Sequence, residues 1–292
     1  MACYQPNLAV DNGIGEDGKH RIKFVTFLHP EWDLKQFREF YGDRLMMLPC
    51  GHCVACAQDY ARTWQARIMC EAEYYDKKCF ITLTYGAEAP LQPSKAHLRE
   101  FIKKLRNRFG NNLKFFACGE KGELNKRSHY HIILFGVDFS EDAVIHGRSK
   151  EAYIYTSDTL SQLWPFGFAV IGNVDVASAG YVSRYCDKKK ISGLDDGEFI
   201  IMSRGLGRRY FLDHKKEIFD SDFLYFGGNK FKIPRYFLKV ALSLDDFYLR
   251  CLVDDLNDRK RLVAQNFRYT SNKSLCLEEN AMKDMKDIEL FY

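Results

Sequence analysis

The middle of the chain alternates between two spacings of apolar residues, the two-residue period of strands and the three-to-four-residue period of helices. Strands are expected at residues 79–85, 114–118, 129–135 and 166–176, and helices at residues 58–75, 94–109, 157–163, 177–189 and 242–262. From residue 79 to residue 189 the order is strand, helix, strand, strand, helix, strand and a further helix. This order predicts a split βαβ, ferredoxin-like fold, which is an α+β arrangement with an antiparallel sheet.

The predicted topology sorts the side chains of the first and third strands onto two faces. In a ferredoxin-like sheet these strands are the central, adjacent pair, and both helices between the strands cover one face. Because side chains alternate along a strand, the apolar and polar residues of this pair separate. The apolar set, expected against the helices, is Ile81, Leu83, Ile132 and Leu134. The polar set, expected on an open face, is Thr82, Thr84, His129 and His131.

The motifs divide the chain into three predicted parts. Residues 1–57 are expected to form a loop-rich N-terminal segment that carries a cluster of cysteines. Residues 58–190 hold the predicted sheet and its helices and form the predicted core domain. Residues 191–292 form a C-terminal extension of mixed structure, for which the sequence indicates no role.

Charge is distributed unevenly along the 292 residues. The formal net charge of +4 is too small to indicate nucleic-acid binding by itself. Between residues 99 and 130, however, nine lysines or arginines stand against three glutamates, whereas the chain after residue 242 is net acidic. A basic middle beside an acidic end suits a polyanionic partner at the middle, although a solvated helix face would give the same pattern.

The sequence gives no indication of a membrane protein or an exported one. No apolar run approaches the ~20 residues that a membrane-spanning helix needs. The N-terminus lacks a basic stretch followed by an apolar core, so no signal peptide is expected. Ten cysteines in a long chain without an export signal favour reduced thiols in a cytoplasm.

Two histidines stand one residue apart in the predicted strand at residues 129–135. His129 and His131 should point to the same face of the sheet, where their imidazoles can share one divalent metal. A His-x-His pair alone is more often a solvated pair than a set of ligands. The neighbouring elements therefore decide how this pair is interpreted.

The predicted helix at residues 177–189 places two tyrosines one turn apart. Tyr181 and Tyr185 lie at positions i and i+4 on one helix face, and Lys188 follows one turn later on roughly the same side. Two hydroxyls and an ammonium that point the same way can serve as nucleophiles and as an electrostatic partner for phosphate. The alternative is that both rings pack into a core, as aromatic pairs at this spacing usually do.

A tight cysteine cluster stands in the N-terminal segment. Cys50, Cys53 and Cys56 are three soft ligands, and Cys3 could be a fourth. Four thiolates would suit structural Zn²⁺, a Cys-x-x-Cys-x-x-Cys run can also hold an iron–sulfur cluster, and His52 is a spare ligand. Three ordinary thiols in a loop are the remaining interpretation.

The order and spacing of these features resemble the three motifs of the HUH endonucleases, which start rolling-circle replication. Within that superfamily the chain is similar to the replication initiators of microviruses, the small single-stranded DNA phages, and above all to those of the gokushovirus branch. The pieces, within residues 50–211, are the cysteine cluster, Phe80–Tyr85, Ala117–Gly122, Arg127–Gly136, Trp164-x-x-Gly167, Tyr181–Lys189 and Met202-Ser-Arg. Ser128 and Gly205-Leu-Gly207 depart from the family, which usually has a proline and a Pro-Gly pair there, and neither change removes a catalytic group.

The resemblance implies a metal-dependent DNA endonuclease and strand transferase. Tyr181 or Tyr185 would attack a DNA phosphodiester, giving a 5′-phosphotyrosyl enzyme and a free 3′-hydroxyl that primes a polymerase. The displaced strand would later be rejoined. Lys188 would neutralise the phosphate or lower the tyrosine pKa.

The resemblance also implies a metal. His129 and His131 would hold Mg²⁺ or Mn²⁺, and imidazole ligands favour Mn²⁺. Glu120 and Glu123 both fall in the predicted turn before the histidine strand. Glu120 is the expected third ligand because it matches a Gly-Glu pair of the family.

The implied partners are a single-stranded viral DNA origin, a host DNA polymerase and a host helicase, in the cytoplasm of a bacterial host. A helicase is needed because the sequence has no Gly-x-x-x-x-Gly-Lys-Ser/Thr loop of its own. Phosphate contacts are expected from basic residues that fix position and carry little sequence information. These residues are Lys103, Lys104, Arg106, Arg108 and Arg127.

Two other functions compete with this one. A ferredoxin-like module that binds single-stranded nucleic acid without catalysis would need exposed aromatic residues on the open face, where threonines and histidines stand instead. A metal-independent phosphodiesterase would need a second His-x-Thr or His-x-Ser motif. His97, His146 and His214 are not followed by one.

Overall fold

The structure, a computed structural model, describes residues 3–18, 20–87, 90–122, 127–149, 152–191 and 197–266, without the side chains of residues 149 and 187–191. Contacts divide the chain into two compact units. The larger unit is formed by residues 60–237, and the smaller unit by residues 1–59 together with residues 238–292. Helix α2 (Val54–Ala72) begins in the smaller unit and continues in the larger one. The three-part division by motifs stays a prediction.

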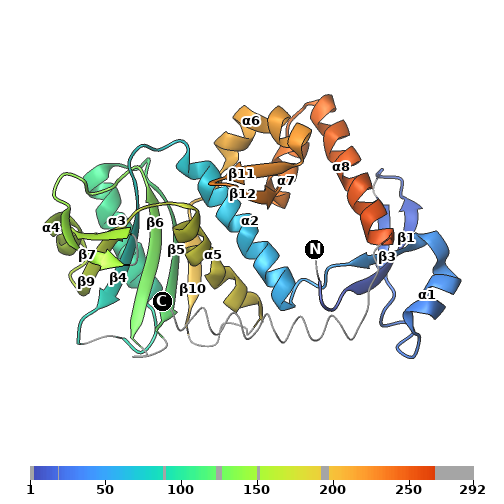
Figure 1. Ribbon diagram of the computed structural model, residues 1–292, viewed down its shortest axis with the longest axis horizontal. Helices are drawn as coiled ribbons and strands as arrows, with labels where there is room; N and C mark the ends of the chain where they lie inside the picture. Colours follow the sequence, from blue (N-terminus) through green and yellow to red (C-terminus); the bar gives the residue numbers. More distant parts are fainter. Residues whose placement is uncertain are drawn as a thin grey trace. The chain divides into compact units, whose positions relative to one another are not determined.

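The larger unit is built on an antiparallel sheet, so the α+β class is confirmed (Figure 1). Its strands follow the order β10-β5-β6-β4-β9-β8-β7. They are β4 (Lys78–Tyr85), β5 (Lys114–Lys121), β6 (Ser128–Phe135), β7 (Val144–Ser149), β8 (Ala152–Thr156), β9 (Gly167–Gly172) and β10 (Phe199–Met202). The predicted adjacency of the first and third core strands is confirmed, because β4 pairs with β6 with Thr82 opposite His131.

Helices α3 (Lys95–Phe109) and α4 (Asp158–Leu163) cover one face of the sheet (Figure 1). Helix α3 begins where the Ser94 hydroxyl accepts a hydrogen bond from the backbone N–H of His97. Its apolar stripe is buried in one core with the predicted apolar set of β4 and β6. The stripe consists of Leu98, Phe101, Ile102 and Leu105.

The opposite face of the sheet is covered by α2 and α5 (Val176–Ile191), so the prediction of an open face is wrong (Figure 1). The Trp64 ring of α2 lies 5.5 Å from the ring of Phe116 on β5. The side-chain amide of Gln65 donates a 2.7 Å hydrogen bond to the carbonyl of Val176, which joins the two helices. The face needs a cover because apolar residues such as Phe116 and Phe135 stand on it beside the polar ones, and both are fully buried.

A further layer of the larger unit attaches to α2. It contains α6 (Arg208–Ser221), the hairpin β11 (Phe223–Phe226) and β12 (Asn229–Lys232), and the start of α7 (Arg235–Ser243). The buried Glu71 carboxylate accepts hydrogen bonds from the backbone N–H of Gly207 and from the Lys114 ammonium, both at 2.7 Å. The Arg67 guanidinium lies between the rings of Trp64 and Tyr236, at 4.1 and 4.0 Å, and donates to the Leu206 carbonyl.

The smaller unit has regular structure where the sequence predicted loops. Strands β1 (Asn7–Ile14), β2 (His20–Phe24) and β3 (Leu45–Leu48) form a sheet in the order β2-β1-β3, and β3 contacts α1 (Leu34–Tyr41) and α8 (Phe247–Gln265). The single turn η1 (Gly42–Arg44) joins α1 to β3. The sequence concealed these strands because β2 is exposed throughout and has no buried alternation. The helix predicted at residues 242–262 is confirmed as α8.

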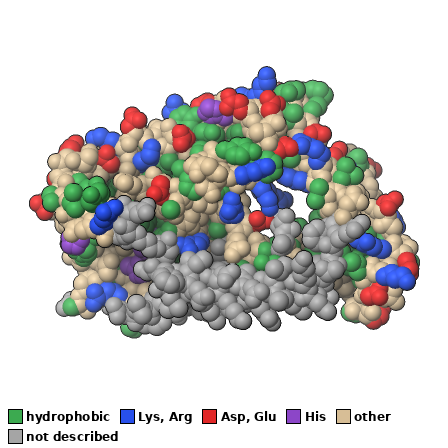
Figure 2. All heavy atoms as spheres, in the orientation of Figure 1, with side chains coloured by type: hydrophobic (Ala, Val, Ile, Leu, Met, Phe, Trp, Pro, Cys, Tyr) green, Lys and Arg blue, Asp and Glu red, His purple; other side chains and the backbone are tan. Residues whose placement is uncertain are grey.

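Figure 2 shows basic and acidic side chains interspersed over the face in view. Among the described helices, none combines the length and the apolar composition that crossing a bilayer requires.

Tyr130 stands between the two histidines of β6 and points to the α3 side of the sheet. The side chain is fully buried, and its hydroxyl contacts the backbone N–H of Ser94 at 2.7 Å, the Ser94 carbonyl at 3.0 Å and the Tyr85 hydroxyl at 2.7 Å. This network ties the histidine strand to the first turn of α3.

We predict that Tyr130→Phe lowers the free energy of unfolding by about 1–3 kcal/mol, because the Ser94 N–H is left without its partner. Urea denaturation followed by circular dichroism measures this change. Tyr225→Phe, at an exposed tyrosine of β11, is the control and should stay within about 0.5 kcal/mol. Equal stability of the two variants would show that the network does not hold the strand.

Candidate functional site

Three potential metal ligands meet on the face of the sheet that α5 covers. Glu120 lies on β5 directly opposite His129 of β6, and His131 is two residues further along the same strand. Glu120 was expected in a turn, but pairing of β5 with both β6 and β10 keeps the chain extended through Lys121. Gly119 allows β10 to pack there, because a Cβ at this position would lie 2.9 Å from the Phe199 ring.

One carboxylate oxygen joins the two imidazoles. Oε1 of Glu120 is 3.0 Å from Nε2 of His131 and also hydrogen-bonds Nε2 of His129. Glu120 and His131 are buried, with 5% and 6% of their surface exposed, whereas the side chain of His129 is less enclosed. The predicted histidine pair and its predicted third partner are therefore brought together.

Burial and charge act against each other in this cluster. Burial alone would raise the pKa of Glu120, but hydrogen bonds and positive charge from His129 and His131 outweigh it and lower the pKa to about 2. Burial would lower the pKa of His129, but its hydrogen bond to Glu120 and the carboxylate charge raise it. Burial lowers the pKa of His131, against the opposing effect of Glu120. The carboxylate is thus ionised and ready to bind a cation.

The Nδ1 atoms of both imidazoles are held by groups outside the cluster. Nδ1 of His131 is 3.0 Å from the Thr82 hydroxyl on β4, and Nδ1 of His129 is 3.1 Å from the Arg127 carbonyl. These contacts orient both Nε2 atoms toward Glu120, as outer contacts orient histidine ligands at metal sites. The sequence analysis gave Thr82 no role. Its position directly opposite His131 was the available signal.

The two tyrosines of α5 point into the same cluster. Asp175 accepts a hydrogen bond from the N–H of Ser178 and so caps the start of the helix. The hydroxyl of Tyr181 lies 3.2 Å from Nε2 of His131, and the hydroxyl of Tyr185 donates a 2.6 Å hydrogen bond to Oε1 of Glu120.

The hydroxyls of Tyr181 and Tyr185 also lie 3.0 Å apart, so their i and i+4 spacing gives the arrangement predicted from the sequence. Burial raises the pKa of both tyrosines, and the negative charge of Glu120 raises them further. Both hydroxyls therefore stay protonated until positive charge enters the site.

The donor set fits a divalent cation. Glu120, His129 and His131 each offer one ligand atom, and these three atoms lie within 4.8 Å of one another. Two imidazoles and one carboxylate suit Mn²⁺ and neighbouring transition metals better than Mg²⁺, which prefers oxygen ligands.

Two candidate residues lie outside the described part of the chain. Glu123 falls in the undescribed stretch between β5 and β6. Lys188 belongs to α5, but its side chain is not among those described.

The basic residues are split between the two faces of the sheet. Lys103, Lys104, Arg106 and Arg108 belong to α3, which covers the face opposite the cluster. Arg127, by contrast, precedes β6 and contacts His129 through its carbonyl. Arg184 of α5, which the sequence analysis did not single out, places its guanidinium 5.3 Å from the centre of the Tyr181 ring.

The four cysteines singled out in the sequence lie together in the smaller unit. Cys3, Cys50, Cys53 and Cys56 each offer a sulfur atom, and these atoms lie within 4.8 Å of one another. They belong to a different compact unit from the histidine cluster.

Comparison with known proteins places the chain among viral replication proteins. Residues 78–190 match the family model of the "Replication-associated protein ORF2" type. The chain is 32% identical over 243 residues to "Replication-associated protein ORF2" of Spiroplasma virus 4, covering 75% of this chain and 74% of that protein. The comparison with solved structures gave no match.

Two further relatives carry similar names. "Replication-associated protein ORF4" of Chlamydia phage 1 is 28% identical over 246 residues, which cover 78% of this chain and 57% of the relative. "Replication-associated protein VP4" of Bdellovibrio phage phiMH2K is 28% identical over 208 residues, which cover 65% of each chain. The match thus spans less than two thirds of these two relatives.

We predict that Thr82→Val lowers the affinity for Mn²⁺ by about 10- to 100-fold, because His131 loses the contact that orients its ring. Isothermal titration calorimetry with MnCl₂ measures the affinity. Thr84→Val, the same substitution on the same face of β4, is the matched control and should bind Mn²⁺ as the unaltered protein does. Equal affinity for both variants would remove Thr82 from the site.

Proposed function

The chain belongs to the replication-associated proteins of microvirus-type phages, and we propose that it initiates rolling-circle replication by cutting single-stranded DNA with a tyrosine. One observation carries this proposal: two tyrosine hydroxyls contact the very atoms that would bind a cation. Tyr181 contacts Nε2 of His131, and Tyr185 donates to Oε1 of Glu120. A nucleophile beside a cation site is the arrangement that phosphoryl transfer requires.

The proposed reaction is a transesterification. The phenolic oxygen of a tyrosine attacks a DNA phosphorus atom and loses its proton, while the bond from phosphorus to the 3′ oxygen breaks and that oxygen takes up a proton. The products are a 5′-phosphotyrosyl enzyme and a 3′-hydroxyl end that can prime a host polymerase. Because one ester replaces another, the covalent intermediate retains the bond energy needed to rejoin the displaced strand.

We assign Glu120, His129 and His131 as the residues that hold Mg²⁺ or Mn²⁺. When bound, such an ion would polarise the scissile phosphate and offset the charge that develops on it. Thr82 and the Arg127 carbonyl keep the imidazoles oriented. Phe80 packs parallel to the His131 ring at 5.7 Å and helps to exclude water from it.

The two tyrosines suit a cycle with two cuts. Their hydroxyls are 3.0 Å apart, so either can occupy nearly the same place. One tyrosine would open the origin, and the other would attack the regenerated origin after a round of synthesis. The displaced strand could then be closed into a circle without leaving the protein.

The fold supports this assignment. The core order β5-β6-β4-β9, with α3 and α4 on one face, is the order expected of the ferredoxin-like HUH sheet. The competing function, a nucleic-acid-binding module without catalysis, needs exposed aromatic residues on β4 and β6. On these strands the face that would carry them is covered by α2 and α5. A host helicase would separate the strands, in the cytoplasm of the bacterial host.

Two groups of basic residues would serve DNA differently. We propose that Arg184, Arg127 and Lys188 act beside the scissile phosphate, whereas the basic residues of α3 contact DNA away from the cut. The position of Arg184 over the Tyr181 ring supports this division, because a guanidinium there favours negative charge on the tyrosine and on phosphate.

We predict that Tyr181→Phe and Tyr185→Phe each retain part of the single-turnover nicking activity, whereas the double variant retains none. The assay incubates circular single-stranded phage DNA with the protein and Mn²⁺, and detects a covalent protein–DNA adduct on a denaturing gel. EDTA should abolish the adduct, and Tyr225→Phe should leave it unchanged. Full activity in the double variant would exclude both tyrosines as nucleophiles.

We also predict that Arg184→Ala slows nicking by about 10- to 100-fold at saturating DNA, because one charge-assisted contact to phosphate is lost. Lys103→Ala should leave that rate unchanged. It should instead weaken DNA binding and reduce the slope of log affinity against log salt by about one. Nicking rates and fluorescence anisotropy in a salt series distinguish the two effects, and the reverse pattern would contradict the division.

A further inference from the structure

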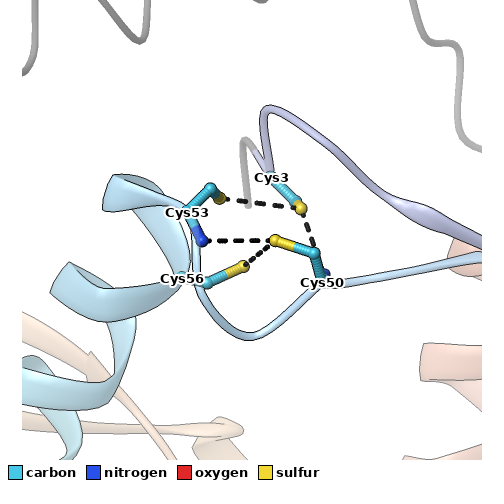
Figure 3. Close-up of side chains that lie close together, drawn as sticks. All are labelled: Cys3, Cys50, Cys53 and Cys56. Carbon is cyan, nitrogen blue, oxygen red and sulfur yellow. Dashed lines mark hydrogen bonds between the residues drawn. The ribbon is translucent and has the colours of Figure 1, made fainter. Parts of the chain in front are cut away.

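Four cysteines from two distant parts of the chain converge at one point (Figure 3). Cys3 precedes β1, Cys50 and Cys53 lie in the loop between β3 and α2, and Cys56 lies in the first turn of α2. Three of the four side chains are buried and that of Cys50 is half-buried. The proposed nicking reaction uses none of them, and they lie in the other compact unit.

The distances between the sulfur atoms are those of a tetrahedron around one metal ion. Sγ of Cys3 lies 3.8 Å from Sγ of Cys53, and Sγ of Cys50 lies 3.9 Å from Sγ of Cys56. Zinc–sulfur bonds of about 2.3 Å in tetrahedral geometry put neighbouring sulfurs about 3.8 Å apart. We infer that Cys3, Cys50, Cys53 and Cys56 bind one Zn²⁺ as a structural site with four thiolate ligands.

Backbone groups already stabilise negative charge on two of these sulfurs. The N–H of Cys50 donates to Sγ of Cys3, and the N–H of Cys53 donates to Sγ of Cys50, both at 3.3 Å. Gly51, with φ at +87°, makes the turn that folds the loop back on itself. Donors that point at thiolates are the outer contacts that support metal–thiolate bonds.

The geometry disfavours the other interpretations of this cluster. A disulfide needs sulfurs about 2.05 Å apart, and each pair here is nearly twice as far. In a [4Fe–4S] cluster each cysteine binds a different iron, which would spread the sulfurs apart, whereas these four share one point. His52, the spare ligand in the sequence, is exposed and does not join the set.

The site answers a physical need of the smaller unit. The described apolar cluster of its β-sheet is small and consists of Val10, Val25, Phe37 and Leu45 with a few half-buried neighbours. Modules with little core commonly depend on a metal or a disulfide for stability. A zinc ion would tie the residues before β1 to the loop before α2, across 47 positions of sequence.

Metal analysis of the full chain tests the site. Inductively coupled plasma mass spectrometry after purification without added metal should find one zinc per chain. Cys53→Ser should lose most of this zinc, whereas Cys251→Ser, at an exposed free cysteine of the same unit, should retain it. The pair His129→Ala and His131→Ala should also retain it, which separates this site from the proposed nicking site.

X-ray absorption at the zinc edge of the unaltered protein gives a result that does not depend on whether variants fold. The expected spectrum has four sulfur neighbours at about 2.3 Å. A shell of nitrogen and oxygen, iron in place of zinc, or zinc retained by Cys53→Ser and lost with the two histidines would each overturn the inference. Failure of the nicking assay would leave it standing, because the two sites share no residue.

Discussion

The register of three antiparallel strands is the constraint on which the candidate site depends. Glu120 faces His129 across β5 and β6, and Thr82 faces His131 across β4 and β6. A slip of one residue in either ladder would turn the ligands to the opposite face of the sheet. The register is fixed by burial, because the same slip would expose Ile81, Leu83, Ile132 and Leu134. The apolar core on one face thus sets the chemistry on the other.

Helix α5 supplies what the sheet lacks, which is a nucleophile and a cover. Its tyrosines reach the ligand cluster because positions i and i+4 lie on one face of the helix. The buried Val182 lies on the side of α5 that packs into the protein. Without the cover, water would screen the attraction between Glu120 and the two imidazoles, and the carboxylate would be a weaker anchor for a cation.

The sequence predicted most of the sheet that positions the site. The strands at residues 79–85 and 129–135 and the helix at 94–109 were close to the observed bounds, because each has a strong period and a cap or turn at its ends. The cover by α2 and α5 was missed because a period shows which face is buried but not by which distant element. Glu120 was placed in a turn because pairing with β10, 80 positions later, cannot be read from local sequence. The strands of the smaller unit were missed because β2 buries none of its residues.

The contact of Arg67 with Trp64 and Tyr236 has a consequence for handling the protein. Solutions of high ionic strength release DNA from basic surfaces, because they screen exposed charges. The guanidinium of Arg67 is buried between two rings, where dissolved ions have little access. The layer formed by α6, β11, β12 and the start of α7 is therefore held to α2 by a cation that salt does not loosen.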